Sequence, residues 1–289
     1  MKKVLLASTA LVMSAGVAAA DVSVGGDGRM GVQSYNGADL GFTSRIRISF
    51  SASGETDAGL AFGGSIRADN SVAGAAGTGG SVFIEGSFGK ITMGDVSGAA
   101  EAAVGDASGV GLTGLGDFNE LAYLSNGVRP AARWDYTTGD LGLHVSSDNP
   151  GPAGDTAMSI AVTYGVGDIS FGIGYEDNGP ADHIAVGVTA AFGDATLKVV
   201  YGASDAADLN TLLGAAFGAV DDDQYAVSLD YVSGATTFTV FGEKNFQGDD
   251  HYGVGVAYDL GGGASIKAGF ADGDSLTDAN YDLGISMSF

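Results

Sequence analysis

The chain ends in the segment NYDLGISMSF, residues 280–289, which alternates between two kinds of side chain. Every second position is large and apolar: Tyr281, Leu283, Ile285, Met287 and Phe289. The residues between them are small or polar. Because successive side chains of a β-strand point to opposite faces, this pattern predicts a two-faced strand. Either the edge of a soluble sheet or the wall of a membrane barrel would have such a strand, and the rest of the chain distinguishes them.

The same alternation recurs along the chain. In RIRISFSAS (45–53), Arg45 and Arg47 alternate with apolar residues, and QYAVSLDY (224–231) repeats the pattern. Turn-forming residues separate these runs. The predicted strands are 22–35, 41–53, 58–70, 80–87, 90–95, 131–137, 140–147, 156–165, 168–177, 182–193, 195–202, 222–232, 235–244, 250–259, 262–272 and 279–289.

The connections and the placement of charge favour a membrane barrel. Short turns such as SFGK (87–90) and GVGD (165–168) alternate with longer, acidic, glycine-rich loops, as in bacterial outer-membrane barrels. In the predicted register no Lys or Arg falls on the apolar face, where one would cost about 2–4 kcal/mol at the bilayer midplane. Most tyrosines and Phe289 fall near strand ends on that face, which is typical of aromatic girdles. We therefore predict an all-β fold, a 16-stranded antiparallel transmembrane β-barrel around a water-filled channel.

The first twenty residues, MKKVLLASTALVMSAGVAAA, have a basic head, an apolar stretch and small residues before Asp21. This pattern predicts a cleaved signal peptide (1–20) and a mature barrel domain (21–289). Of 12 basic residues, removal of Lys2 and Lys3 leaves 10, against 35 acidic residues. So acidic a chain is not expected to bind nucleic acid.

The predicted functional site lies in the lumen. One connection, residues 95–130, is far longer than the others, and a loop of this length is usually functional. If it folds inward, it would narrow the channel as a constriction loop with an acidic edge. Its acidic residues are Glu101, Asp106, Asp117 and Glu120.

A basic wall is predicted opposite this loop. Arg29, Arg45, Arg47 and Arg67 fall on the lumen side of three successive strands, which lie roughly 4.8 Å apart, so they can form one cluster. Charge of opposite sign on two sides of a pore sets selectivity together with its diameter. In the alternative interpretation, these arginines only pair with lumen acids for stability.

The chain resembles the general porins of α-proteobacteria, especially the Rhodobacter type. The matching stretches are GDGRMGVQSYNG (26–37), FTSRIRISF (42–50), SVFIEGSFGKITMGD (81–95), YGVGVAYDLGGGASIKAGFADGD (252–274) and LGISMSF (283–289). The resemblance implies a homotrimer in outer-membrane lipid that lets small hydrophilic solutes and ions diffuse passively. It also implies that the third long loop forms the constriction, with a basic side at the four arginines and an acidic side at Glu101 and Asp106.

No cofactor is expected to be required. The family can bind calcium near its loops, and DGDSLTD (272–278) offers Asp272, Asp274 and Asp278 as oxygen ligands; the alternative is a solvated acidic loop. The sequence predicts no enzymatic activity, because no nucleophile, base and orienting group can be identified around its three histidines. A structural or adhesive barrel without transport remains the competing function. The acidic lumen predicts a mild preference for cations.

Overall fold

The computed structural model describes residues 21–70, 76, 77, 79–125, 129–150, 156–205 and 221–289. The predicted signal peptide, residues 1–20, lies outside the described residues. Within the described ranges, no helix is long and apolar enough to cross a membrane.

The described part of the chain contains seventeen strands and one short helix. The first half holds β1 (Asp21–Ser34), β2 (Gly41–Glu55), β3 (Ala61–Asp69), β4 (Ala76–Gly77), β5 (Ser81–Gly86), β6 (Gly89–Gly94), α1 (Ala99–Val104), β7 (Ala131–Thr138) and β8 (Leu141–Ser147). The second half holds β9 (Met158–Val166), β10 (Ile169–Asp177), β11 (Asp182–Phe192), β12 (Ala195–Ser204), β13 (Asp223–Ser233), β14 (Thr236–Lys244), β15 (Asp250–Gly261), β16 (Ala264–Gly273) and β17 (Asn280–Ser288).

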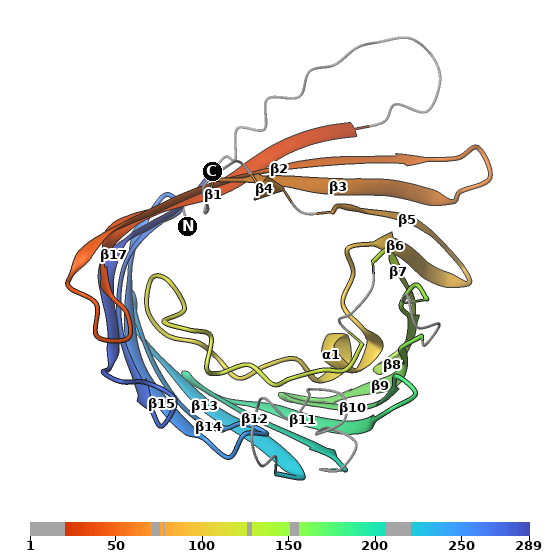
Figure 1. The fold of residues 1–289 in the computed structure, drawn as a ribbon. Helices are drawn as coiled ribbons and strands as arrows, with labels where there is room; N and C mark the ends of the chain where they lie inside the picture. The colour runs from red at the N-terminus through yellow and green to blue at the C-terminus, as the bar shows by residue number, and fades with distance from the viewer. Residues whose placement is uncertain (1–20, 71–75, 78, 126–128, 151–155, 206–220) are drawn as a thin grey trace.

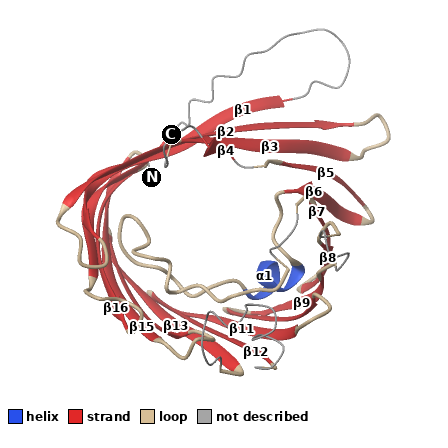
Figure 2. Ribbon diagram, in the orientation of Figure 1, coloured by secondary structure: helices blue, strands red, loops and turns tan. Residues whose placement is uncertain are grey.

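The strands form one antiparallel sheet that closes on itself (Figures 1 and 2). β1 pairs with β2 on one side and with β17 on the other. The last residue continues this closure, since Phe289 and Gly26 exchange two backbone hydrogen bonds of 2.6 and 3.0 Å. Apart from β4, which has two residues, sixteen strands of six residues or more make up the ring. The prediction of a closed sixteen-stranded barrel is confirmed, and closure leaves no sheet edge exposed to lipid.

The two ends of the barrel differ in their connections. At one end, six of the seven connections are two-residue turns, and five of these begin with a glycine at positive φ. Gly139 (φ 59°) and Gly167 (φ 58°), for example, each precede an aspartate. A glycine at the first central position suits the hairpin turns whose twist matches that of the strands. All the long connections therefore lie at the other end.

The outer and inner faces of the wall have opposite character, as β10 illustrates. Its outward side chains Phe171, Ile173 and Tyr175 are exposed all along the strand, whereas Gly172, Gly174 and Glu176 are buried. Exposed large apolar side chains recur on the outer face of nearly every strand. Such a face suits hydrocarbon, and most of the tyrosines near strand ends are exposed on it as predicted.

The buried apolar residues lie inside the ring. One cluster contains Val104, Ala107, Leu121, Ala185, Val200 and Ala226, and a second contains Val110, Leu115, Phe241 and Ala271. In each cluster the first residues come from the connection after β6 and the others from the wall. Figure 1 shows this connection, including α1, inside the ring of strands along the β8–β16 side. Its described part, residues 95–125, is called the inner segment below.

Candidate functional site

The helix α1 of the inner segment lies directly against the barrel wall. The N–H groups of Ala99 and Ala100, in its first turn, donate to the hydroxyl oxygens of Ser146 (2.8 Å) and Ser159 (2.9 Å). Free N–H groups at a helix start need such partners. Both alanines are fully buried. A Cβ on Gly174 would lie 2.5 Å from the Ala100 Cβ, so the wall must be glycine at this point for the helix to fit.

Inward polar side chains hold the rest of the segment to the same wall. The Asp282 carboxylate accepts from the N–H groups of Leu112 (2.9 Å) and Thr113 (2.7 Å). Further along, Gln224 both accepts from and donates to the backbone of Ala122 (2.9 and 2.7 Å). The Glu176 carboxylate accepts from Leu124 N–H at 3.0 Å and from the Ser125 hydroxyl. Glu176 and Asp282 lie at inward positions of β10 and β17, and the alternation of the sequence does not reveal this anchoring function.

Four acidic residues predicted for the constriction lie close enough to interact electrostatically. Glu101, Asp106 and Asp117 each act on the carboxyl of Glu120. Two effects raise the pKa of Glu120 to about 7: partial burial is the larger, and repulsion by these three negative charges adds to it. Enclosure also raises the pKa of Asp106, against the opposing effect of its hydrogen bond from Leu121 N–H (2.9 Å). The segment thus presents a carboxylate cluster in which one member titrates near neutrality.

One basic residue of the wall adjoins this cluster, which the sequence analysis did not anticipate. The Lys198 ammonium acts electrostatically on Asp106, and a Cβ on Gly105 would lie 3.1 Å from its Nζ. Lys198 lies on β12, behind the inner segment. It therefore partly offsets the charge of Asp106 from the wall side. Only its inward position on the strand gave a signal in the sequence.

The four predicted arginines form a separate group on β1, β2 and β3. Arg29 is directly opposite Arg45 in the register of β1 and β2. Arg45 pairs with Asp27 (3.2 Å), and Arg47 pairs with Asp69 (2.7 Å). Arg67 lies 3.5 Å from the same Asp69. The arginines therefore form a cluster on one wall, and three of them also pair with lumen acids. The predicted cluster and the alternative of pairing with lumen acids each describe part of their environment.

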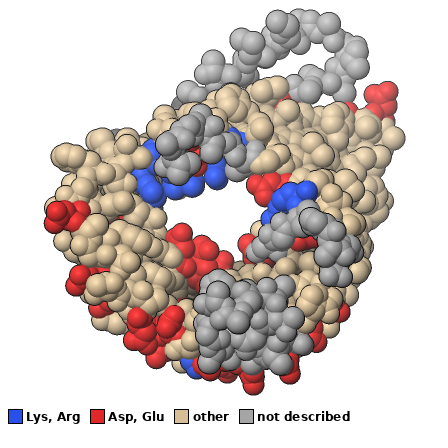
Figure 3. Space-filling view, in the orientation of Figure 1, with Lys and Arg blue, Asp and Glu red and all other residues tan. Residues whose placement is uncertain are grey.

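The arginine wall and the inner segment meet at one point. Arg29 Nη1 donates to the Leu112 carbonyl at 3.2 Å. Asp117 lies near enough to act electrostatically on the same guanidinium. Elsewhere the two sides are separated by an opening, and Figure 3 shows basic side chains along its upper edge and acidic side chains along its lower left. Charges of opposite sign thus border the opening.

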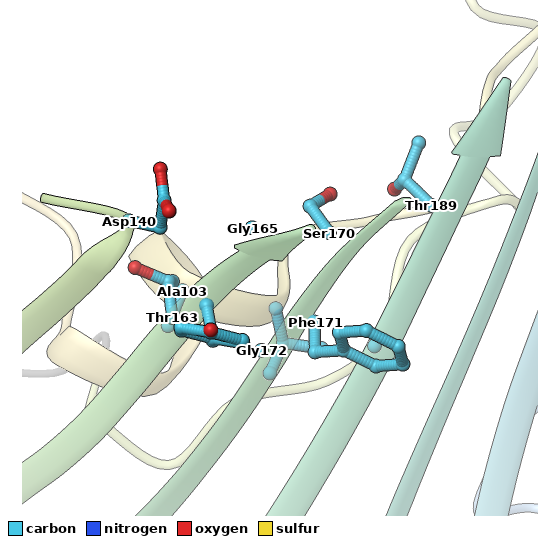
Figure 4. Close-up of a pocket in the computed structure, with 11 residues that line it drawn as sticks. Ala103, Asp140, Thr163, Gly165, Ser170, Phe171, Gly172 and Thr189 are labelled. Carbon is cyan, nitrogen blue, oxygen red and sulfur yellow. The ribbon is translucent and has the colours of Figure 1, made fainter. Parts of the chain in front are cut away.

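A small hollow lies beside the C-terminal end of α1. Its volume is about 220 Å³, and its lining includes Ala103, Asp140, Thr163, Ser170 and Thr189. Figure 4 shows their polar groups on one side of the strands. The hollow places hydroxyls and one carboxylate on the wall that carries the inner segment.

The described residues contain no group of three or more His, Cys, Asp or Glu side chains arranged to hold a metal ion. Asp272, Asp274 and Asp278 are therefore not brought together as the calcium site suggested by their spacing. The carboxylate of Asp272 accepts from the Tyr252 hydroxyl (3.3 Å), and that of Asp274 accepts from Asp250 N–H (3.3 Å). Each of these two carboxylates thus accepts a hydrogen bond from β15.

The structure does contain a hydrogen-bonded chain of a serine, a histidine and a glutamate, which could not be identified from the sequence. Ser275 Oγ lies 2.6 Å from His251 Nε2, and His251 Nδ1 lies 2.7 Å from Glu243 Oε2. The N–H groups on both sides of Ser275, however, are already bonded: Asp274 N–H donates to Asp250 O (3.0 Å) and Leu276 N–H to Gly273 O (3.1 Å). They cannot also stabilise an oxyanion. Phe118 of the inner segment stacks on His251 (4.3 Å between ring centroids), so the chain of bonds ties a loop and the segment to the wall.

Comparison with known proteins identifies relatives along the whole barrel. A family model described as "Gram-negative porin" matches residues 7–287. The porin of Rhodobacter capsulatus is 38% identical over 303 residues, which cover 93% of this chain and all of the relative. A porin structure refined at 1.8 Å resolution superimposes with a TM-score of 0.79 at 33% identity, covering 93% of this chain and all of that one. A variant of the Rh. blastica porin, at 22% identity and a TM-score of 0.69, shares the fold over the same fractions.

Proposed function

This chain belongs to the Gram-negative porin family and is an outer-membrane diffusion channel, and we propose that its constriction lies between the inner segment and the arginine wall. Arg29, Arg45, Arg47 and Arg67 form the basic side. Glu101, Asp106, Asp117 and Glu120 form the acidic side. The observation that carries this proposal is that the inner segment is held to one side of the barrel wall. Its backbone donates hydrogen bonds to inward side chains of β8–β17, such as Ser146, Glu176 and Asp282.

Because the inner segment is bonded to one side of the wall, it narrows the lumen, and the two sides of the remaining opening carry charges of opposite sign. Small ions and hydrophilic solutes pass between fixed charges of opposite sign, so that selectivity depends on both charge and diameter. The carboxylates outnumber the basic groups over the chain as a whole, which supports a mild preference for cations. We propose no catalytic step for this channel, because the N–H groups of the residues on both sides of Ser275 already donate to backbone carbonyls.

The experiment that tests the channel and its selectivity is a planar-bilayer recording of the purified protein. We expect large ohmic conductance steps and a reversal potential of cationic sign in a KCl gradient. Anion preference would contradict the proposed charge balance of the constriction. A folded, heat-modifiable barrel without conductance would contradict an open pore and favour a structural or adhesive barrel.

The trimer also belongs to this proposal, and the outer wall supports it. β5 and β6 have six residues each and so rise only about 20 Å, less than the apolar band of about 25 Å expected of such barrels. The outer face here has an apolar hollow of about 710 Å³, whose lining includes Val22, Phe50, Ile66 and Val82. Because a second copy of this chain can cover a short wall better than lipid, we place the subunit contact here. Residues 1–20 are proposed as the signal peptide that directs export.

Unheated gel electrophoresis of two variants tests this contact. Ile66→Glu lies in the proposed contact, whereas Val186→Glu lies on β11, elsewhere on the outer face. We expect the trimer band to be lost for Ile66→Glu and kept for Val186→Glu. Equal loss in both variants, or in neither, would contradict this position for the contact.

A further inference from the structure

A row of serines crosses the lumen wall on the side without the inner segment. Ser51 of β2 is opposite Ser23 of β1 and Ser65 of β3, and Ser65 is opposite Ser81 of β5. All four side chains face the lumen, as the arginines do. Ser23, Ser51 and Ser65 each lie an even number of residues from an arginine of the same strand, and Ser81 is paired with Ser65. Neighbouring members of the row are roughly 4.8 Å apart. The row lies between the arginines and the end of the barrel with the short turns.

Further hydroxyls surround this row. Two adjoining hollows of about 290 Å³ each share Ser51, Ser65 and Ser81 in their linings. Ser49 completes the hydroxyls of the first hollow, while Ser23, Ser53 and Thr92 line the second. Together they place seven hydroxyl groups on one concave surface, called the hydroxyl wall below.

The hydroxyl wall differs from the opposite wall in what its side chains bind. On the opposite side, the hydroxyls of Ser146, Ser159 and Ser228 each accept from a backbone N–H of the inner segment. The seven hydroxyls of the hydroxyl wall, by contrast, form no side-chain hydrogen bond with any of the described residues. They therefore remain available to water or to a passing solute.

The charges at the edges of the hydroxyl wall are balanced. The first hollow includes Arg67 and Asp95, and the second includes Lys90 and Asp21. Asp95 also pairs with Arg129 (3.1 Å), and Lys90 lies over the ring of Phe83, 4.2 Å from its centroid. Each hollow thus has one group of each sign at its edge and hydroxyls between them. An ion of either sign therefore gains little electrostatic free energy from such a surface.

We propose that the hydroxyl wall is a weak binding site for neutral polyhydroxylated solutes of the sugar and polyol class. A serine hydroxyl donates one hydrogen bond and accepts others, so it can meet the hydroxyls of a sugar in either sense. Several such groups in register match a solute that carries several hydroxyls. This inference rests on the diffusion-channel function and names the solute class that this wall of the channel favours.

The test is a titration of single-channel current with D-glucose, with triethylene glycol as a neutral solute that has fewer hydroxyls. We expect glucose to add saturable current noise and triethylene glycol to add none. Replacing Ser51, Ser65 and Ser81 together with alanine should raise the half-saturating glucose concentration by at least about eightfold, because each of the three lost hydrogen bonds is worth a factor of about 2 to 10.

A matched variant on the opposite wall serves as control. Ser170→Ala with Thr189→Val removes two lumen hydroxyls from the hollow beside α1, and it should leave the glucose titration unchanged. An equal response of both variants, or no saturable glucose effect in a conducting channel, would overturn the site while the channel function stands. Tighter binding of glucuronate than of glucose would also overturn it, because the site would then favour anions. A loss of conductance in KCl alone would instead count against the channel.

Discussion

Asp282 of β17 and Thr113 of the inner segment are joined by two hydrogen bonds, since the Asp282 Oδ2 accepts both the N–H and the hydroxyl of Thr113 at 2.7 Å. The same carboxylate accepts from the N–H of Leu112. Asp282 is itself buried, at 4% exposure. One side chain of the last strand therefore fixes the middle of a segment that lies 169 residues earlier in the chain.

Asp282→Ala should free this part of the segment. Three donors would lose their acceptor, and we expect a loss of about 2–4 kcal/mol in the free energy of unfolding. Open-channel current noise should rise, because the segment would move within the lumen. Urea unfolding in detergent and single-channel recordings measure the two effects. Asp168→Ala, in a two-residue turn at the far end, is the control, and an equal change there would show that the effect is not specific to the anchor.

Gly174→Leu should displace α1 from the wall. A Cβ at this position would meet Ala100 at 2.5 Å, and a leucine would need still more room. We expect a smaller conductance and a stability loss of about 1–3 kcal/mol, as for other overpacked sites. Gly165→Leu is the matched variant, since a Cβ there meets nothing within 4 Å. If conductance is unchanged in Gly174→Leu, then α1 does not border the narrow part of the pore.

Cation preference should increase as the pH rises from 6 to 8. The pKa of Glu120 is raised to about 7, so its carboxyl is largely neutral below this pH and charged above it. Reversal potentials in a KCl gradient at several pH values measure the change. In Glu120→Gln the step should disappear, although Asp106, whose pKa is also raised, can leave a smaller slope at lower pH. A wild-type profile that is flat from pH 6 to 8 would contradict the position of Glu120 in the ion path.

Removal of two basic charges from the arginine wall should strengthen cation preference. Arg45→Gln with Arg47→Gln removes the ion pairs with Asp27 (3.2 Å) and Asp69 (2.7 Å), while Arg67 stays 3.5 Å from Asp69. The cation-to-anion permeability ratio should rise about two- to fivefold at low salt, because a unit charge at 4 Å is worth about 1 kcal/mol in water. The effect should shrink at 1 M KCl, where the screening length is about 3 Å. An unchanged ratio at low salt would show that ions do not pass near these arginines.

The fold could be predicted from the sequence because strand alternation is a local signal. Each of the sixteen predicted ranges coincides with a strand, and their limits differ by no more than three residues. The arginine cluster was predictable for the same reason, since Arg29, Arg45 and Arg67 lie on three successive strands whose register follows from short connections. The additional two-residue strand β4 has too few residues to give a period.

The position of the inner segment against the wall could not be predicted, because it depends on hydrogen bonds between residues that are far apart in the sequence. Leu112 and Asp282 are 170 residues apart, and nothing local to either indicates the contact. The hydrogen-bonded chain of Ser275, His251 and Glu243 was missed for a related reason: its members lie on three separate elements. The acidic spacing at 272–278 suggested a calcium site, but spacing alone does not bring three carboxylates together: Asp272 and Asp274 each accept a hydrogen bond from β15, and the described residues hold no such group.

The most direct test of the proposed constriction is chemical modification of Glu120→Cys during a single-channel recording. The chain has no cysteine of its own, so a methanethiosulfonate reagent would react at this position alone. With the segment bordering the narrow part of the pore, a bulky reagent should lower the conductance by at least about half, because pore diameter limits the current. Complete modification, verified by mass, with unchanged conductance would contradict a constriction formed by the inner segment and the arginine wall.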